Sequence, residues 1–90
     1  MINVRSNGKE GIYFISIAAR LAEVHPRTLR IYEDEGLISP KRTAGNTRLY
    51  CDKDVKKVKY IRFLTQDKGV NLAGVKMIFE LMERLGEWEK

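Results

Sequence analysis

The chain has 90 residues, of which 43% are hydrophobic, and this suffices for one small domain with a single core. Seventeen Lys and Arg residues against twelve Asp and Glu residues give a net charge of +5, which favours a polyanionic partner such as nucleic acid or an anionic membrane surface. With one cysteine and one histidine, an internal disulfide and a multi-cysteine zinc site are excluded, and no segment reads as a signal peptide or a membrane span. We therefore expect a soluble cytoplasmic protein in a reducing compartment.

The positive charge is concentrated in the middle of the chain. Residues 36–62 contain eight basic and two acidic side chains, so this stretch alone carries +6. The end of the chain is acidic, with Glu80, Glu83, Glu87 and Glu89. The basic central stretch predicts a positively charged face that contacts nucleic acid, although a solvated helix surface would give the same pattern.

Residues 1–11 are polar and contain two glycines, which predicts a flexible N-terminal arm. The first helix is expected over residues 16–23. Ser16 is a good N-cap residue, and apolar residues follow at spacings of three and four.

A second helix is predicted over residues 26–35. Pro26 suits its first turn, and Gly36 suits the position that closes a helix. Leu29 and Tyr32 would form its buried stripe. Only residues 23–25 separate the two helices, and two short helices joined by so tight a turn form a helix-turn-helix, here residues 16–36. His25 would cap the second helix or contact phosphate rather than bind a metal.

Residues 37–50 have the character of a β-hairpin. Gly45 and Asn46 suit its tip, and Thr47, Leu49 and Tyr50 suit a strand. A hairpin that directly follows a helix-turn-helix is a wing.

Two further helices are predicted, over residues 52–67 and 71–88. Cys51 or Asp52 would cap the first and Asn71 the second. The core stripe of the last helix would consist of Val75, Ile78, Phe79, Met82 and Leu85. Leu81, Leu85 and Trp88 lie near the chain end, where they serve either the core or a dimer interface. The expected fold is mostly α: a winged helix-turn-helix with four helices and one small β-hairpin wing.

The second helix carries the side chains that would read DNA. A helix in the major groove reads bases from its N-terminal half, where Arg27, Thr28 and Arg30 stand. Arg can donate two hydrogen bonds to a guanine edge, and Thr can contact thymine. Tyr32 would keep its ring in the core and its hydroxyl free for a phosphate. Taken singly, each of these residues could equally be an ordinary surface or core residue.

The wing supplies further cations that could reach the DNA backbone or the minor groove. Charged residues also protect exposed strand edges, so a solubilising role remains the alternative. Ser16 and Arg62 are included in the predicted contact set, which the wing completes with Lys41, Arg42, Asn46 and Arg48. No nucleophile is paired with a base and no glycine-rich phosphate loop is present, so we expect no enzyme, no cofactor and no metal.

The helix-turn-helix and the wing resemble one known family. The core Thr28-Leu29-Arg30-Ile31-Tyr32-Glu33, the Gly36-Leu37-Ile38-Ser39-Pro40 run and the Arg42–Tyr50 segment are similar to the DNA-binding domain of MerR-family transcription regulators. Residues 69–76 resemble the heat-shock repressor (HspR) branch. The resemblance covers about residues 12–80 of the chain, with residues 12–90 taken as the domain.

This resemblance implies a transcriptional regulator, and within that branch a repressor of stress genes. It implies homodimeric binding to an inverted repeat of double-stranded DNA, a second small wing at residues 68–72, and the chaperone DnaK as a co-repressor. The wing, with Gly45-Asn46-Thr47-Arg48, is one residue longer than the family's usual Gly-Tyr-Arg. The family's long dimerisation helix would follow residue 90, so we expect either part of a longer protein or a member that dimerises differently.

Two other functions are compatible with the sequence besides that of a nucleoid-associated regulator. An excisionase-like architectural factor, which bends DNA for recombination, would also be small and basic. A protein-interaction module with a positive face would bind acidic partners and no duplex.

Overall fold

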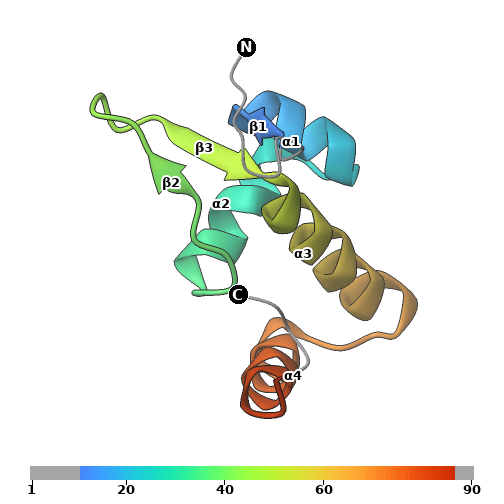
Figure 1. Cartoon of the computed structure of the whole chain (residues 1–90). Helices are drawn as coiled ribbons and strands as arrows, with labels where there is room; N and C mark the ends of the chain where they lie inside the picture. Colours follow the sequence, from blue (N-terminus) through green and yellow to red (C-terminus); the bar gives the residue numbers. More distant parts are fainter. Residues whose placement is uncertain (1–10, 87–90) are drawn as a thin grey trace.

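Four α-helices, a π-helical turn and three short strands make up residues 11–86, the part of the chain that the structure, a computed structural model, describes. In chain order the elements are β1 (Ile12–Tyr13), α1 (Ile15–Ala22), α2 (Pro26–Asp34), β2 (Lys41–Arg42), β3 (Arg48–Cys51), α3 (Asp52–Arg62), η1 (Phe63–Asp67) and α4 (Leu72–Arg84) (Figure 1). The predicted mostly helical, winged helix-turn-helix fold is confirmed. Trp88 and all but the last residue of the predicted arm lie outside the described residues.

The first helix begins one residue earlier than predicted, and its cap differs. Its N-cap is Phe14, which is extended and provides no side-chain cap. The carbonyl of Phe14 accepts from the N–H groups of Ile17 and Ala18 at 3.1 and 3.0 Å. The prediction that Ser16 caps this helix is therefore wrong, because the chain turns directly from β1 into α1 and Ser16 falls inside the first turn.

The turn between α1 and α2 closes without a glycine. Glu23 takes the left-handed conformation, with φ 62° and ψ 43°. Its N–H donates to Arg20 O at 3.1 Å, and the N–H of Val24 donates to Ala19 O at 2.9 Å. This is the Schellman closure, in which glycine is the usual left-handed residue.

Both predicted ends of α2 are confirmed. Pro26 occupies the first turn, and the ring of His25 accepts a hydrogen bond from the backbone of Arg27. At the other end Gly36 has φ +78°, and the N–H of Leu37 donates to Tyr32 O at 2.9 Å. The helix is thus fixed at both ends by local interactions.

The sheet has three antiparallel strands in the order β1-β3-β2, one more than the predicted hairpin. Tyr13 pairs with Tyr50 in β3. The N–H of Gly11 and the hydroxyl of Tyr13 donate to the two carboxylate oxygens of Asp52 at 2.8 and 2.5 Å. Gly11 is therefore tied to the first turn of α3, which corrects its assignment to a flexible arm.

A tight loop joins β2 to β3 and projects away from the helices (Figure 1). The N–H of Thr43 donates to Thr47 O at 2.9 Å, and the N–H of Asn46 donates to Thr43 O at 2.8 Å. Asn46 has φ 70°. A turn followed by one left-handed residue is typical of three-residue hairpin loops, so the predicted tip is confirmed with Asn46, not Gly45, as the special residue.

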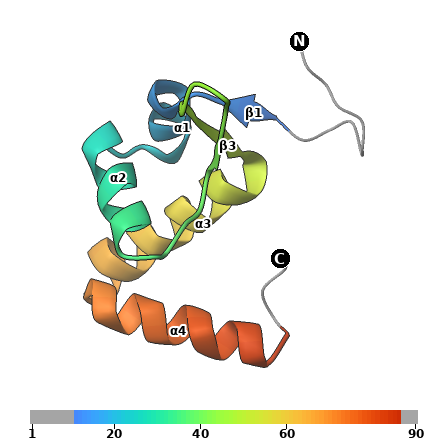
Figure 2. The same cartoon turned by 90° about the vertical axis from the view of Figure 1, so that its left-hand side faces the viewer.

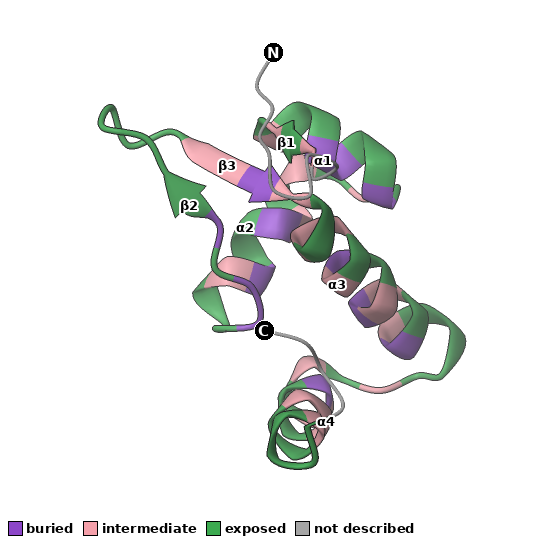
Figure 3. Cartoon of the chain, viewed as in Figure 1, coloured by how far each residue is buried: buried purple, intermediate pink, exposed green. Residues whose placement is uncertain are grey.

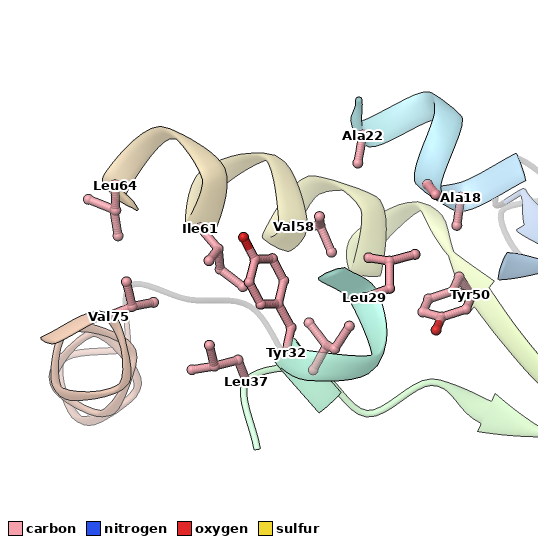
Figure 4. Close-up of a cluster of buried hydrophobic side chains, with 12 residues drawn as sticks. Ala18, Ala22, Leu29, Tyr32, Leu37, Tyr50, Val58, Ile61, Leu64 and Val75 are labelled. Carbon is pink, nitrogen blue, oxygen red and sulfur yellow. The ribbon is translucent and has the colours of Figure 1, made fainter. Parts of the chain in front are cut away.

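The core lies between α1, α2, α3 and the base of the hairpin (Figures 3 and 4). Val58 and Ile61 of α3 and Leu64 of η1 are buried in this core. Leu37 and Ile38, which were assigned to the wing, are buried in this core instead. The projecting hairpin therefore begins only at Lys41.

The last helix crosses below the others and packs mainly against η1 (Figure 2). Asn71 caps it as predicted, since its side chain accepts from the N–H of Gly74 at 2.8 Å. Val75 is fully buried, but Leu85 is 70% exposed. The prediction of Leu85 as a core residue is wrong because α4 ends at Arg84 and the rest of the domain does not extend that far. No helix within residues 11–86 is long and apolar enough to cross a membrane.

Candidate nucleic-acid interface

One face of α2 presents cations to solvent while the opposite face is buried. Leu29 is completely buried, and Arg27 and Arg30 are exposed. Ile31, four residues after Arg27, is 42% exposed on the same side. This face combines bidentate donors with an apolar group, the two kinds of side chain that distinguish base edges in the major groove.

The first turn of α2 is held rigidly. Nδ1 of His25 accepts from the N–H of Arg27 at 3.0 Å, and its carbonyl accepts from the N–H of Thr28 at 2.9 Å. Thr28 is half-buried. The expectation that His25 caps the helix is confirmed, and the cap fixes the backbone from which Arg27 projects.

The wing is joined to α2 by a single carboxylate. Nη2 of Arg42 lies 2.9 Å from Oε2 of Glu33, and Nε of Arg48 lies 2.7 Å from Oε1. Arg42 and Arg48 face each other across the β2–β3 ladder. Glu33 therefore takes one arginine from each strand of the hairpin, and Nη1 of Arg42 also donates to the carbonyl of Asn46 at 3.3 Å.

The electrostatics of this cluster keep its members charged. The hydrogen bond from Arg48 lowers the pKa of Glu33, partial burial opposes it, and Arg42 adds to the lowering. The hydrogen bond to Glu33 raises the pKa of Arg48. The cluster holds two positive charges against one negative charge at neutral pH.

The two remaining predicted wing residues, Lys41 and Asn46, take no part in the ion pairs of Glu33. Lys41 is exposed and makes no ion pair with any residue of the 11–86 range. Asn46 is exposed at the turn. Both can reach a ligand that approaches the hairpin.

Two predicted contacts lie on other elements. Ser16 is exposed in the first turn of α1. Arg62, near the end of α3, lies 3.7 Å from the carboxylate of Glu23 in the helix-turn-helix turn. The structure places Arg62 beside that turn and does not bring it to the wing.

The prediction of a free tyrosine hydroxyl in α2 is wrong. Tyr32 is only 6% exposed, and its side chain points toward α3, next to Ile61 (Figure 4). Burial raises the pKa of Tyr32, and a hydrogen bond with Thr65 opposes the rise. A side chain that lies between two helices is a core residue and is not available to a phosphate.

Sequence reasoning overlooked two residues of this surface, Glu33 and Ile31. Nothing in the sequence singled out Glu33, because its two arginine partners follow nine and fifteen residues later. Ile31 could have been found from helical spacing, since it falls on the face opposite Leu29. No group of three or more potential metal ligands occurs in the described part of the chain.

The exposed face of α2, the short turn before it and the hairpin after it define a winged helix-turn-helix domain. Residues 13–81 match the family described as MerR HTH family regulatory protein. The chain belongs to this MerR family.

The chain is similar to several regulators of known kind. It is 47% identical over 76 residues to a putative heat shock protein HspR of Streptomyces coelicolor, covering 84% of the chain and 50% of the relative. It is 38% identical over 76 residues to the HTH-type transcriptional regulator GlnR of Bacillus anthracis, covering 84% of the chain and 58% of the relative.

A solved structure supports the same assignment. The fold matches HiNmlR, a MerR family regulator lacking the sensor domain, bound to promoter DNA, with a TM-score of 0.72 and 28% identity. The match covers 79% of this chain and 54% of that one. The chain thus spans about half the length of the relatives it matches.

Proposed function

We propose that this chain binds a specific sequence of double-stranded DNA and regulates transcription, with α2 in the major groove and the hairpin against the flanking backbone. The observation that supports this most directly is that Arg27 and Arg30 lie exposed on one helix face while Glu33, on the same helix, holds the basic hairpin beside it. Base-reading and phosphate-contacting groups are thereby presented by one rigid unit.

The relatives favour regulation over the architectural role. HspR, GlnR and HiNmlR are regulators or heat-shock proteins by name. From the HspR similarity we propose that the regulated genes are stress genes and that the chain acts as a repressor, with a chaperone co-repressor. Such a protein works at the nucleoid of the cytoplasm and needs no enzymatic activity.

Selection of bound sequences from a random duplex pool tests this function. A regulator should recover one sequence that is also present in a promoter. Recovery of no sequence at low salt, or binding of all duplexes with equal affinity, contradicts sequence-specific regulation. Recovery of a recombination attachment site in place of a promoter would favour the excisionase-like factor.

We propose further that two copies bind an inverted repeat. Three apolar side chains spaced four residues apart line the outer face of α4 and its C-cap and are 68%, 53% and 70% exposed: Met77, Leu81 and Leu85. A second copy of the chain could cover this stripe. Leu81→Glu should then lower the mass measured by sedimentation in the presence of the selected repeat, whereas Glu80→Gln on the same helix should not.

A further inference from the structure

Glu33 holds an unusual position for an acidic residue in a surface that binds DNA. It lies on α2, the helix that carries Arg27 and Arg30, and its side chain is 21% exposed. Both carboxylate oxygens are occupied by arginines of the wing, at 2.9 and 2.7 Å. A carboxylate in this place repels phosphate and at the same time satisfies the guanidinium groups that phosphate would attract.

The two arginines are the wing residues best suited to phosphate. A guanidinium presents paired N–H donors that fit a phosphate as well as a carboxylate. Each arginine that transfers from Glu33 to a DNA phosphate would displace counterions and steepen the salt dependence of binding. Such contacts carry no base information, so they would strengthen binding to any duplex equally.

We propose that Glu33 is a specificity-determining residue, which withholds Arg42 and Arg48 from indiscriminate phosphate contacts and fixes the wing on the reading helix. The arginines then add to binding only where the groove geometry places the wing correctly. The proposal rests on the DNA-binding function proposed above and assigns to Glu33 a role in discrimination, not in affinity.

Glu33→Gln and Glu35→Gln form a matched pair of variants. Each removes one negative charge at the C-terminal end of α2, where Glu35 is the C-cap. Glu35 is exposed and makes no ion pair within residues 11–86. Binding of the full chain to the selected duplex and to a scrambled duplex of equal length would be measured by fluorescence anisotropy between about 50 and 200 mM salt.

Glu33→Gln should bind the scrambled duplex about 3- to 10-fold more tightly, with a salt slope steeper by about one to two units, because up to two arginines become available to phosphates. Affinity for the selected duplex should change less, so the ratio of specific to random binding falls. Glu35→Gln should leave that ratio close to the wild-type value. Hydrogen exchange should also be faster at the Thr43 amide in Glu33→Gln, since the wing has lost its attachment.

A second measurement separates action through the arginines from plain charge removal. In an Arg42→Gln/Arg48→Gln background, Glu33→Gln should alter binding no more than Glu35→Gln does. The proposal is overturned if Glu33→Gln and Glu35→Gln have equal effects in the wild-type background. It is also overturned if the effect of Glu33→Gln is undiminished in the Arg42→Gln/Arg48→Gln background. If the wild-type chain binds neither duplex at low salt, the proposed function itself fails.

Discussion

Nδ1 of His25 accepts a hydrogen bond from the backbone N–H of Arg27 at 3.0 Å. The residue that ends the helix-turn-helix turn therefore also caps α2. With Pro26 between them, the cap leaves the start of α2 little conformational freedom. The direction in which Arg27 leaves the backbone is set by this arrangement.

His25→Ala should destabilise the domain by about 1 kcal/mol, as is usual when a helix cap is lost. His25→Asn should retain most of the stability, because its amide oxygen can accept the same N–H. Urea unfolding followed by circular dichroism would measure both. Equal stabilities for the two variants would show that the cap does not contribute.

Replacing Arg27 or Lys41 by alanine should weaken DNA binding in different ways. Arg27→Ala, like Arg30→Ala, should cost about 1–3 kcal/mol against the selected duplex and relax base preference at one position. Lys41→Ala, which removes an exposed cation of the wing, should weaken binding to all sequences and lower the salt slope by about one unit. Competition assays on selected and scrambled duplexes would distinguish these patterns. Equal losses on both duplexes for every variant would contradict the division between reading helix and wing.

Tyr32→Phe should leave the salt dependence of DNA binding unchanged. The side chain is buried and points toward α3, so its hydroxyl does not face the solvent side of α2. A tyrosine that contacted phosphate would contribute to affinity for any duplex. A loss of affinity shared by selected and scrambled duplexes, without a loss of stability, would show that the Tyr32 hydroxyl contacts phosphate after all.

Asp52 should make the stability of the domain sensitive to acid. The N–H of Gly11, and then the hydroxyl of Tyr13, hold the pKa of Asp52 below its ordinary value of 3.8. Because the pKa is lowered by folding, the stabilisation is fully present above pH 3.8 and is lost as the pH falls through the lower pKa of the folded state. The stability difference between the wild type and Asp52→Asn should therefore shrink as the pH falls through this range. A difference that does not vary with pH in urea unfolding experiments would exclude the contribution.

Most helix positions and caps were predictable because they depend on neighbours in the chain; the Ser16 cap was the exception, because the chain turns directly from β1 into α1. The Pro26 start, the Gly36 end and the Asn71 cap each follow from conformational preferences of single residues. The strand β1 was missed because two residues give no measurable alternation, and its pairing partner Tyr50 lies far along the chain. Its existence depends on tertiary contact alone.

The candidate site likewise has features that the sequence predicts and features that depend on tertiary contacts. Exposure of Arg27 and Arg30 follows from the helical period once Leu29 is placed in the core. The attachment of the wing to Glu33 does not, since it joins residues nine and fifteen positions apart whose approach is set by the hairpin. The error at Tyr32 has the same origin, because helical period places the ring in the core and only the packing of α3 decides where the hydroxyl goes.

Glu23 should be the position where a single substitution stabilises the domain. Its left-handed conformation, φ 62°, costs a residue with a β-carbon about 1–2 kcal/mol, and glycine avoids this cost. The side chain contributes little in return, since it is 72% exposed and its carboxylate lies 3.7 Å from Arg62.

Glu23→Gly should therefore raise the free energy of unfolding by about 1 kcal/mol, after part of the gain is offset by the greater flexibility of glycine in the unfolded chain. Glu23→Ala is the matched control, because it removes the same carboxylate and keeps the β-carbon in the left-handed region. Urea unfolding of both variants should find the glycine variant the more stable. If the alanine variant matched it, the turn would carry no strain at this residue, and the absence of glycine from the turn between α1 and α2 would have no energetic consequence.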